Sequence, residues 1–470
     1  MIFTSYTYVG FLLVVFLVNW LLPARMRNAF LVVASYVFYA AWKWQFAFLL
    51  LGLSVFNWAY ARWILAKAES TWPLIVGVGV NLGALVYFKY TNFLIANVAA
   101  VANLLGGGWH PSPADIILPL GISFFTFQGI AYLFDVATGE EPLESLLSFL
   151  LFKALWPQLI AGPIIRLGEI RAQLEAHRAL TYDHVAYGAR RILSGFFKKI
   201  VLADNIAPAV EMAFLNRGTP GAMDVVAGVL GFSLQIYFDF SAYSDIAIGS
   251  ARLFGFTFPE NFNWPYVSTT PQEFWNRWHM TLSRWIRDYV YTPLSFSTRR
   301  KPAMAPLWLL FAMALCGLWH GAQWTFVLWG LWHGILLTVG AVVQRRAGAT
   351  ASAMRSAAGW LLTFVGVCLG WLLFRATSVT QAVGMLRAVF SLRGGVRPTV
   401  LRENEVLFIG VVFAIMLLIQ LSQRLMPEGV LATTRRSPLM RILKPVAYAV
   451  MIIAVVVFDQ EAKAFVYFQF

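Results

Sequence analysis

The sequence predicts an all-α polytopic membrane protein, with about 11 to 13 transmembrane or re-entrant helices. Of its 470 residues, 59% are hydrophobic and only 12% are charged, about half the charged share of a soluble protein. The mean hydropathy is +0.68, and apolar runs able to cross a hydrocarbon core of about 30 Å recur along the chain. These features exclude a set of soluble domains, a disordered chain and a secreted disulfide scaffold.

The apolar runs predict where the helices lie. The first run follows no basic residue and has no small-residue cleavage site, so it is expected to be a membrane helix and not a cleaved signal. Several runs are short or contain Gly and Pro, which favours re-entrant or interfacial segments. The polar stretch 165–184 predicts a short surface helix. The runs cover residues 2–22, 29–42, 46–64, 72–88, 91–105, 116–134, 146–164, 185–203, 222–256, 305–320, 323–343, 358–374, 405–425 and 445–460.

Basic residues predict the orientation, because the cytoplasmic loops of membrane proteins are rich in Lys and Arg. Arg25 and Arg27 follow the first run, and Arg62 and Lys67 come one helical hairpin later. We therefore expect a multi-pass protein of a bacterial inner membrane with a periplasmic amino terminus. The same rule places Arg299–Lys301 and Arg345–Arg346 in the cytoplasm.

Charge and cysteine content limit the partners and cofactors. Basic cytoplasmic loops account for the net charge of +14, so we expect membrane lipid but no nucleic acid as a partner. The two cysteines, Cys316 and Cys368, both lie in apolar runs. Neither a disulfide framework nor a zinc cluster is predicted, and we expect no bound metal or cofactor.

A five-residue repeat contains two histidines. Gly317–Gly321 and Gly330–Gly334 both read Gly-Leu-Trp-His-Gly. On a continuous helix, His320 and His333 would differ by about 220° of rotation and about 20 Å of rise. They would then lie on nearly opposite faces, so at most one of them is expected to do chemistry.

Ionisable residues inside apolar segments are costly and mark candidate sites. The first cluster, Gln272–Asp288, combines charged residues with three tryptophans and predicts an amphipathic helix. Such a helix either lies at the lipid headgroups or dips into the protein and lines a polar cavity. Both readings remain open from the residues alone.

The second cluster centres on His320, with Gly317, Gly321 and Gln323 close in sequence. No Asp or Glu occurs between Tyr289 and Arg402, so a locally encoded Ser-His-Asp relay or His-carboxylate zinc motif is excluded. A histidine in apolar surroundings stays neutral, as a general base requires. The alternative is a packed, hydrogen-bonded core histidine.

The third cluster, Gly231–Arg252, places Asp239 and Asp245 in an otherwise apolar segment with Tyr243. A cation-binding or proton-relay role is one interpretation. Structural pairing with a neighbouring helix is the other. Asp245 and Arg252 share a helix face but lie about 10 Å apart along the axis.

Five segments together resemble the membrane-bound O-acyltransferases, and in particular the bacterial branch that serves alginate O-acetylation and D-alanine export. The resemblance runs from the first helix to Phe465–Phe470 and covers the whole chain, which we therefore treat as one integral-membrane acyltransferase domain. Residues 1–115 supply amino-terminal helices, 116–345 the core motifs and 346–470 the carboxyl-terminal helices. The five segments are 118–136, 157–166, 235–249, 274–294 and 317–334.

The resemblance implies helices that enclose a central tunnel, in which an acyl group passes from a cytoplasmic thioester to a hydroxyl at an intramembrane histidine. The family's invariant histidine matches His320, and its second polar position matches His279; His333 has no such match. The matched motifs also imply the residues that bind substrate, which are Gln158, Asp239, Tyr243, Asn276, Arg277, Trp278, Trp319 and Gln323.

The implied activity is O-acetylation of an extracellular polysaccharide such as alginate or cellulose. The implied donor is acetyl-CoA or an acyl-carrier thioester, and the implied partner is a periplasmic esterase-like acetyltransferase. Two alternatives remain open: a polysaccharide or lipid-intermediate transporter that uses the same polar residues, and an O-acyltransferase that acts on a lipid or a protein.

Overall fold

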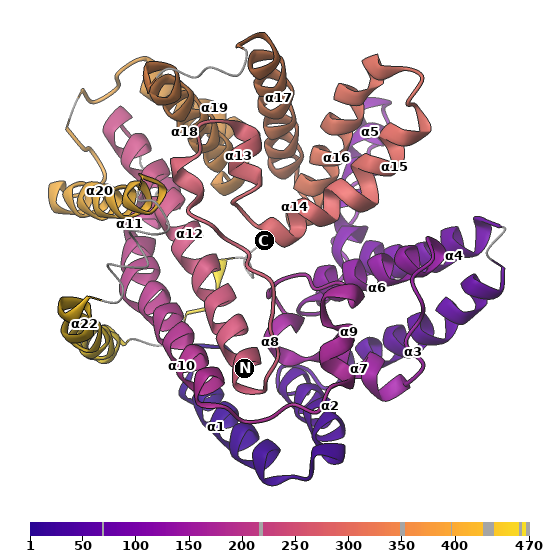
Figure 1. Ribbon diagram of the computed structural model, residues 1–470. Coiled ribbons are helices and arrows are strands. Elements are labelled where there is room, and N and C mark those ends of the chain that lie inside the picture. Colours follow the sequence, from indigo (N-terminus) through magenta and orange to yellow (C-terminus); the bar gives the residue numbers. More distant parts are fainter. Residues whose placement is uncertain are drawn as a thin grey trace. The chain divides into compact units, whose positions relative to one another are not determined.

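The computed structural model describes residues 1–67, 70–215, 220–347, 353–395, 397–425, 437–459 and 463–466 (Figure 1). Throughout these ranges the regular elements are helices and none is a strand, which confirms the all-α class. Among the residues that the structure describes, seven helices are long and apolar enough to cross a membrane, and four apolar helices are shorter. The protein is therefore a multi-pass membrane protein.

The chain forms two compact units. The first comprises Met1–Ile192 and Ser244–Pro259, and the second comprises Leu193–Tyr243 and Glu260–Phe470. One long helix, α12 (Ala222–Leu253), begins in the second unit and ends in the first. This grouping does not test the single acyltransferase domain, which stays a prediction.

The first unit holds the amino-terminal helices. Helix α1 begins where the Ser5 side chain accepts a hydrogen bond from the Tyr8 N–H, a standard amino-terminal cap. The expected surface helix in 165–184 is confirmed by α9. The elements of the unit are α1 (Tyr6–Leu21), α2 (Ala24–Ala40), α3 (Gln45–Ala66), α4 (Trp72–Leu85), α5 (Thr91–Leu104), α6 (Ile122–Ala137), α7 (Leu146–Ala154), α8 (Trp156–Leu159), α9 (Leu167–Glu175) and most of α10 (Tyr182–Phe196).

Three of the expected runs are divided differently in the structure. Runs 72–88 and 91–105 form one continuous helix, Trp72–Leu104, because a π-helical turn, Val86–Tyr90, joins α4 to α5 without a break. Run 146–164 is instead divided into α7 and α8. Pro157 is the second residue of α8, and a proline lacks the N–H that a continuous helix would need there.

The second unit carries the remaining helices. Helix α19 was not predicted, because its 12 residues are too few to span a bilayer; Ser378 caps its start by accepting from the Gln381 N–H. The helices are α11 (Asp204–Leu215), α12, α13 (Pro271–Trp275), α14 (Met280–Ile286), α15 (Thr292–Ser297), α16 (Ala305–His320), α17 (Trp324–Ala347), α18 (Ala353–Arg375), α19 (Val379–Phe390), α20 (Glu403–Leu425) and α22 (Pro438–Val457).

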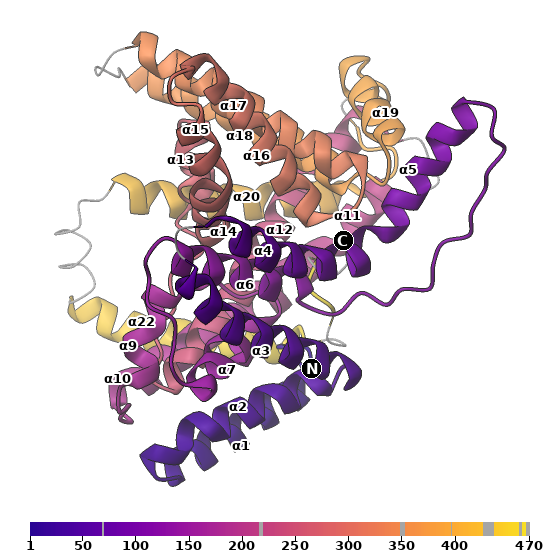
Figure 2. The same cartoon turned by 90° about the vertical axis from the view of Figure 1, so that its right-hand side faces the viewer.

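Helices α16 and α17 form a tight hairpin, and α18 packs on α17 (Figure 2). Glycines of the sequence repeat allow the close approach. A β-carbon on Gly317 would lie 2.0 Å from the Phe326 carbonyl oxygen, and one on Gly330 would lie 2.1 Å from the Met313 carbonyl oxygen. Small residues let membrane helices meet backbone to backbone, so the repeat is a packing motif of this hairpin.

Changing Gly317 to alanine is expected to destabilise the protein. A glycine-to-alanine change inside a helix normally stabilises by up to about 1 kcal/mol, but here the new methyl group meets a backbone oxygen. The matched control is Gly410→Ala in α20, where nothing lies within 4 Å of the added carbon. Thermal unfolding in detergent should give a lower Tm for Gly317→Ala and an equal or higher Tm for Gly410→Ala. Equal Tm values for both variants would contradict the packing argument.

Candidate active site

Three buried histidines alternate with tryptophans in the second unit. The Trp319 indole lies between two imidazoles, 6.2 Å from His279 and 4.9 Å from His320 between ring centroids. The Trp329 indole lies between His320, at 5.1 Å, and His333, at 4.9 Å. The exposed fractions of His279, His320 and His333 are 0%, 6% and 1%. The structure thus gathers the predicted catalytic pair around Trp319.

The expected rotation between His320 and His333 is wrong, because the two residues do not share one continuous helix. Helix α16 ends at His320, and α17 begins at Trp324. The Gly321 backbone is extended at this point, which turns the chain into the hairpin. As a result both imidazoles pack against one indole, that of Trp329. Their separate roles stay a prediction.

His320 is enclosed by aromatic rings. Its imidazole lies 5.3 Å from the Phe374 ring in addition to Trp319 and Trp329, with ring planes inclined by 71° to 90°. Edge-to-face packing of this kind fixes the orientation of a ring. The three aromatic rings therefore hold the His320 imidazole in one place.

The predicted amphipathic helix over 272–288 is wrong. Helix α13 ends at Trp275, residues 276–279 are not α-helical, and α14 begins at Met280. The break occurs because His279 adopts the left-handed region, with a φ of 40°, and the Met280 N–H donates to the Asn261 carbonyl oxygen at 2.9 Å. The strained turn withdraws His279 from the helix surface into the protein.

The His279 ring has one satisfied nitrogen. Its Nδ1 lies 3.1 Å from the Asn261 side-chain oxygen, whereas its buried Nε2 has no hydrogen-bond partner among the described residues. His279 lies outside the candidate membrane spans, and burial lowers its pKa to about 3. The ring is therefore neutral at physiological pH.

The residues next to His279 divide between buried and exposed positions. Trp278 is 1% exposed, and its ring packs 4.8 Å from Trp371. Asn276 is exposed, as is Gln323 after His320. Arg277 is half-buried, and its guanidinium bonds the Glu273 carboxylate at 3.1 Å and the Asn263 carbonyl oxygen at 3.1 Å. Substrate binding by these side chains stays a prediction.

Glu273 anchors this segment. Its carboxylate accepts from the Thr269 N–H at 2.7 Å, from Arg277, and from Arg424 in α20 at 3.0 Å. Burial opposes its ionisation, but the Thr269 N–H, Arg424 and Arg277 together hold the pKa of Glu273 below its ordinary value. The turn before His279 is thus tied to α20 by a charged carboxylate.

Asp239 lies in a buried ion-pair cluster. Its Oδ1 lies 2.6 Å from Lys199 Nζ, which also lies 2.9 Å from Asp204. Its Oδ2 accepts from the Val466 N–H at 2.8 Å. This is structural pairing, one of the two interpretations from the sequence. Tyr243, one turn further along α12, packs 4.5 Å from Phe465; Tyr467–Phe470 of the matched terminal motif lie outside the described residues.

The other acidic residue of α12 also has a partner. Asp245 pairs with Arg191 of α10 at 2.7 Å within the first unit. Arg252 instead bonds the Thr257 hydroxyl, and its guanidinium lies 5.8 Å from the Tyr187 ring centroid. Asp245 and Arg252 are therefore held by different neighbours, in agreement with their expected axial separation.

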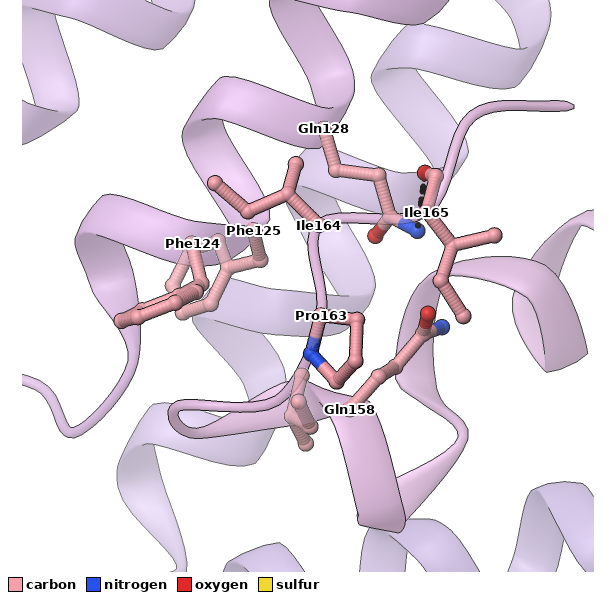
Figure 3. Close-up of a pocket in the computed structure, with 8 residues that line it drawn as sticks. Phe124, Phe125, Gln128, Gln158, Pro163, Ile164 and Ile165 are labelled. Carbon is pink, nitrogen blue, oxygen red and sulfur yellow. Dashed lines mark hydrogen bonds between the residues drawn. The ribbon is translucent and has the colours of Figure 1, made fainter. Parts of the chain in front are cut away.

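Gln158 belongs to the first unit, where it lines a small cavity (Figure 3). The cavity has room for about one water molecule, about 10 Å³, beside Gln128 and Pro163. Gln128 donates to the Ile165 carbonyl oxygen at 3.4 Å, and the Gln158 side-chain oxygen has no partner among the described residues. The lining is mostly apolar, and the two glutamines are its polar side chains.

The sequence analysis missed one polar residue of the site, Asn261. It is completely buried, but its Asn-Phe-Asn context is typical of an ordinary loop, so no sequence signal distinguished it. Within the described residues, no group of three or more His, Cys, Asp or Glu side chains could hold a metal ion.

Several known proteins have sequences similar to that of this chain. A sequence profile of the membrane-bound O-acyltransferase family matches residues 142–383. The probable alginate O-acetylase AlgI of Pseudomonas aeruginosa is 40% identical over 407 residues, 83% of this chain and 75% of that protein. The peptidoglycan O-acetyltransferase of Helicobacter pylori is 35% identical over 82% of this chain and 79% of that protein.

A more distant relative is the teichoic acid D-alanyltransferase of Bacillus subtilis, 31% identical over 49% of this chain and 60% of that protein. The profile match includes four of the five segments singled out in the sequence, 157–166, 235–249, 274–294 and 317–334. The chain belongs to the membrane-bound O-acyltransferase family.

Proposed function

We propose that this membrane acyltransferase moves an acetyl group from a cytoplasmic thioester across the membrane for O-acetylation of an extracellular polysaccharide. The names of the relatives support acetyl transfer to alginate or to peptidoglycan, and cellulose is a further acceptor to test. The observation that carries the proposal is the buried pair His279 and His320, which both pack against Trp319. Both histidines lie in the part of the chain that the family profile matches.

In the proposed reaction, neutral His320 takes the proton of an acceptor hydroxyl while the oxygen attacks the thioester carbonyl carbon. The carbon–sulfur bond then breaks, and the thiolate takes the proton from the imidazolium as it leaves. General base catalysis of this kind contributes about 10²- to 10⁴-fold. Burial protects the thioester from hydrolysis, because the aromatic surroundings exclude water.

The donor and the acceptor are on opposite sides of the membrane in this proposal. The donor is acetyl-CoA or an acyl-carrier thioester in the cytoplasm, and a tunnel brings it to His320. The protein resides in a bacterial inner membrane with a periplasmic amino terminus. A periplasmic esterase-like acetyltransferase receives the group and passes it to the sugar.

The test compares the surface polysaccharide of cells with and without this protein by mass analysis. We expect acetyl esters to be lost from one polymer in the deletion strain and to return when the gene is restored. A second assay follows free thiol released from acetyl-CoA by the purified protein with an alcohol acceptor. An unchanged acetyl content together with no thiol release would reject acetyl transfer and would favour a transporter.

A further inference from the structure

We infer that Asn261 is a positioning residue that fixes the tautomer of His279, so that His279 Nε2 acts only as a hydrogen-bond or proton acceptor. The inference deepens the proposed function, on which it rests. It narrows the role of His279, for which family membership alone allows both donation to a carbonyl and acceptance from a hydroxyl.

The first step is the orientation of the Asn261 amide. Its Oδ1 lies 3.3 Å from the Thr281 backbone N–H and 3.0 Å from the Thr281 hydroxyl. A backbone N–H can only donate. If the amide were rotated, its NH₂ group would face that N–H, donor against donor. The atom that faces Thr281 is therefore the oxygen, because only the oxygen of the amide can accept a hydrogen bond from that N–H.

The second step transfers this constraint to His279. The same Oδ1 lies 3.1 Å from His279 Nδ1. Since the oxygen can only accept, the hydrogen bond requires a proton on Nδ1. A neutral imidazole carries one N–H, so Nε2 is left with its lone pair. This nitrogen is buried and has no partner among the described residues.

The third step is rigidity. His279 and Asn261 are both fully buried, with 0% exposure. The Asn261 carbonyl oxygen accepts from the Met280 N–H at 2.9 Å. The backbone and the side chain of Asn261 therefore both bind the turn that contains His279. The ring also packs edge-on against Phe240 at 4.6 Å, with an interplanar angle of 90°. The imidazole is thus held in one place as well as in one tautomer.

The consequence for the reaction is specific. A lone pair at Nε2 accepts a hydrogen bond from a second hydroxyl of the acceptor, because the hydroxyl that reacts gives its proton to His320. Neutral His279 therefore holds the acceptor. It cannot donate to the thioester carbonyl oxygen, because that would need a proton on Nε2. Asn261 thereby does for His279 what a carbonyl or carboxylate does for a metal-binding or catalytic histidine.

The direct test is nitrogen NMR of detergent-solubilised protein labelled with ¹⁵N-histidine, with the His279 signals assigned by their loss in His279→Gln. We expect a protonated Nδ1 and an unprotonated Nε2. A proton on Nε2 in the neutral ring would overturn the inference, even if acetyl transfer itself is demonstrated. If the expected tautomer is found but the protein does not transfer acetyl groups, the proposed function is rejected and the inference about the tautomer stands.

Variants test the effect on turnover in the thiol-release assay. Asn261→Leu removes the acceptor, and we expect a loss of about 10- to 100-fold with mixed tautomers. Asn261→Asp keeps the acceptor and stabilises the imidazolium, so activity should return with its acid limb moved to higher pH. Thr281→Val, the matched control, removes one hydroxyl and should retain the native tautomer and pH profile. Full activity in a folded Asn261→Leu protein, or an Asn261→Asp pH profile identical to the native one, would contradict the inference.

Discussion

Replacing His320 with alanine is expected to reduce acetyl transfer by about 10²- to 10⁴-fold, the usual contribution of a general base. The loss should appear in the turnover number, because the imidazole acts on the proton that moves in the transition state. Trp319, Trp329 and Phe374 surround the ring, and alanine leaves a cavity among them. The variant must therefore be compared with one that fills this space.

His320→Gln keeps most of the volume and a hydrogen-bonding end but cannot act as a base near neutral pH. Both His320 variants should be inactive in the thiol-release assay while they elute as folded, membrane-extracted protein. The matched control is His333→Gln, which changes another buried imidazole that packs against Trp329 and should retain most of the activity. Native turnover in either His320 variant would remove this residue from the mechanism.

Replacing Lys199 with methionine is expected to destabilise the protein by about 3–5 kcal/mol, the usual effect of leaving a buried charge without its partner. Lys199 and Asp239 are each 1% exposed and lie 2.6 Å apart, and Lys199 also neutralises Asp204. Methionine matches the aliphatic length of lysine, so the variant mainly removes the charge and its hydrogen bonds. Unfolding in detergent measures the change.

Two companion variants separate charge from packing. Lys198→Met alters the adjacent lysine, which bonds the Ser241 hydroxyl at 2.9 Å, and should cost about 0.5–1.5 kcal/mol, as for a single hydrogen bond. Lys199→Met combined with Asp239→Leu removes both charges and should be more stable than Lys199→Met alone. If the double variant is less stable than Lys199→Met, the destabilisation of the single variant does not come from leaving Asp239 without its positive partner.

The sequence predicted much of the fold, because the bilayer imposes a simple rule on helix length and composition. Runs such as 222–256 and 405–425 correspond to α12 and α20 with small end shifts. The prediction failed where local backbone hydrogen bonds determine whether a helix continues or breaks. Phe88-Lys89-Tyr90 contains no helix breaker and continues the helix, whereas the turn at His279 depends on a hydrogen bond to residue 261, far away in the sequence.

The candidate site was predicted in part. His320, His279 and Trp319 were selected from motifs, and the structure places them together. The relation of His320 to His333 was missed because periodicity cannot show that a helix stops between them. Asn261 was missed because an asparagine in a loop has no pattern of its own; only its burial and its contacts with His279 and Thr281 distinguish it.

The bond from the Val466 N–H to Asp239 constrains how the protein is made. These two residues are 227 positions apart, so during synthesis α12 is inserted long before its carboxylate can receive that hydrogen bond. Until then Lys199, which also pairs with Asp204, is the residue that neutralises the Asp239 carboxylate inside the protein. This contact of the enzyme is therefore completed only after residue 466 has been translated, and nascent chains stalled before that residue should be more susceptible to membrane quality-control proteases.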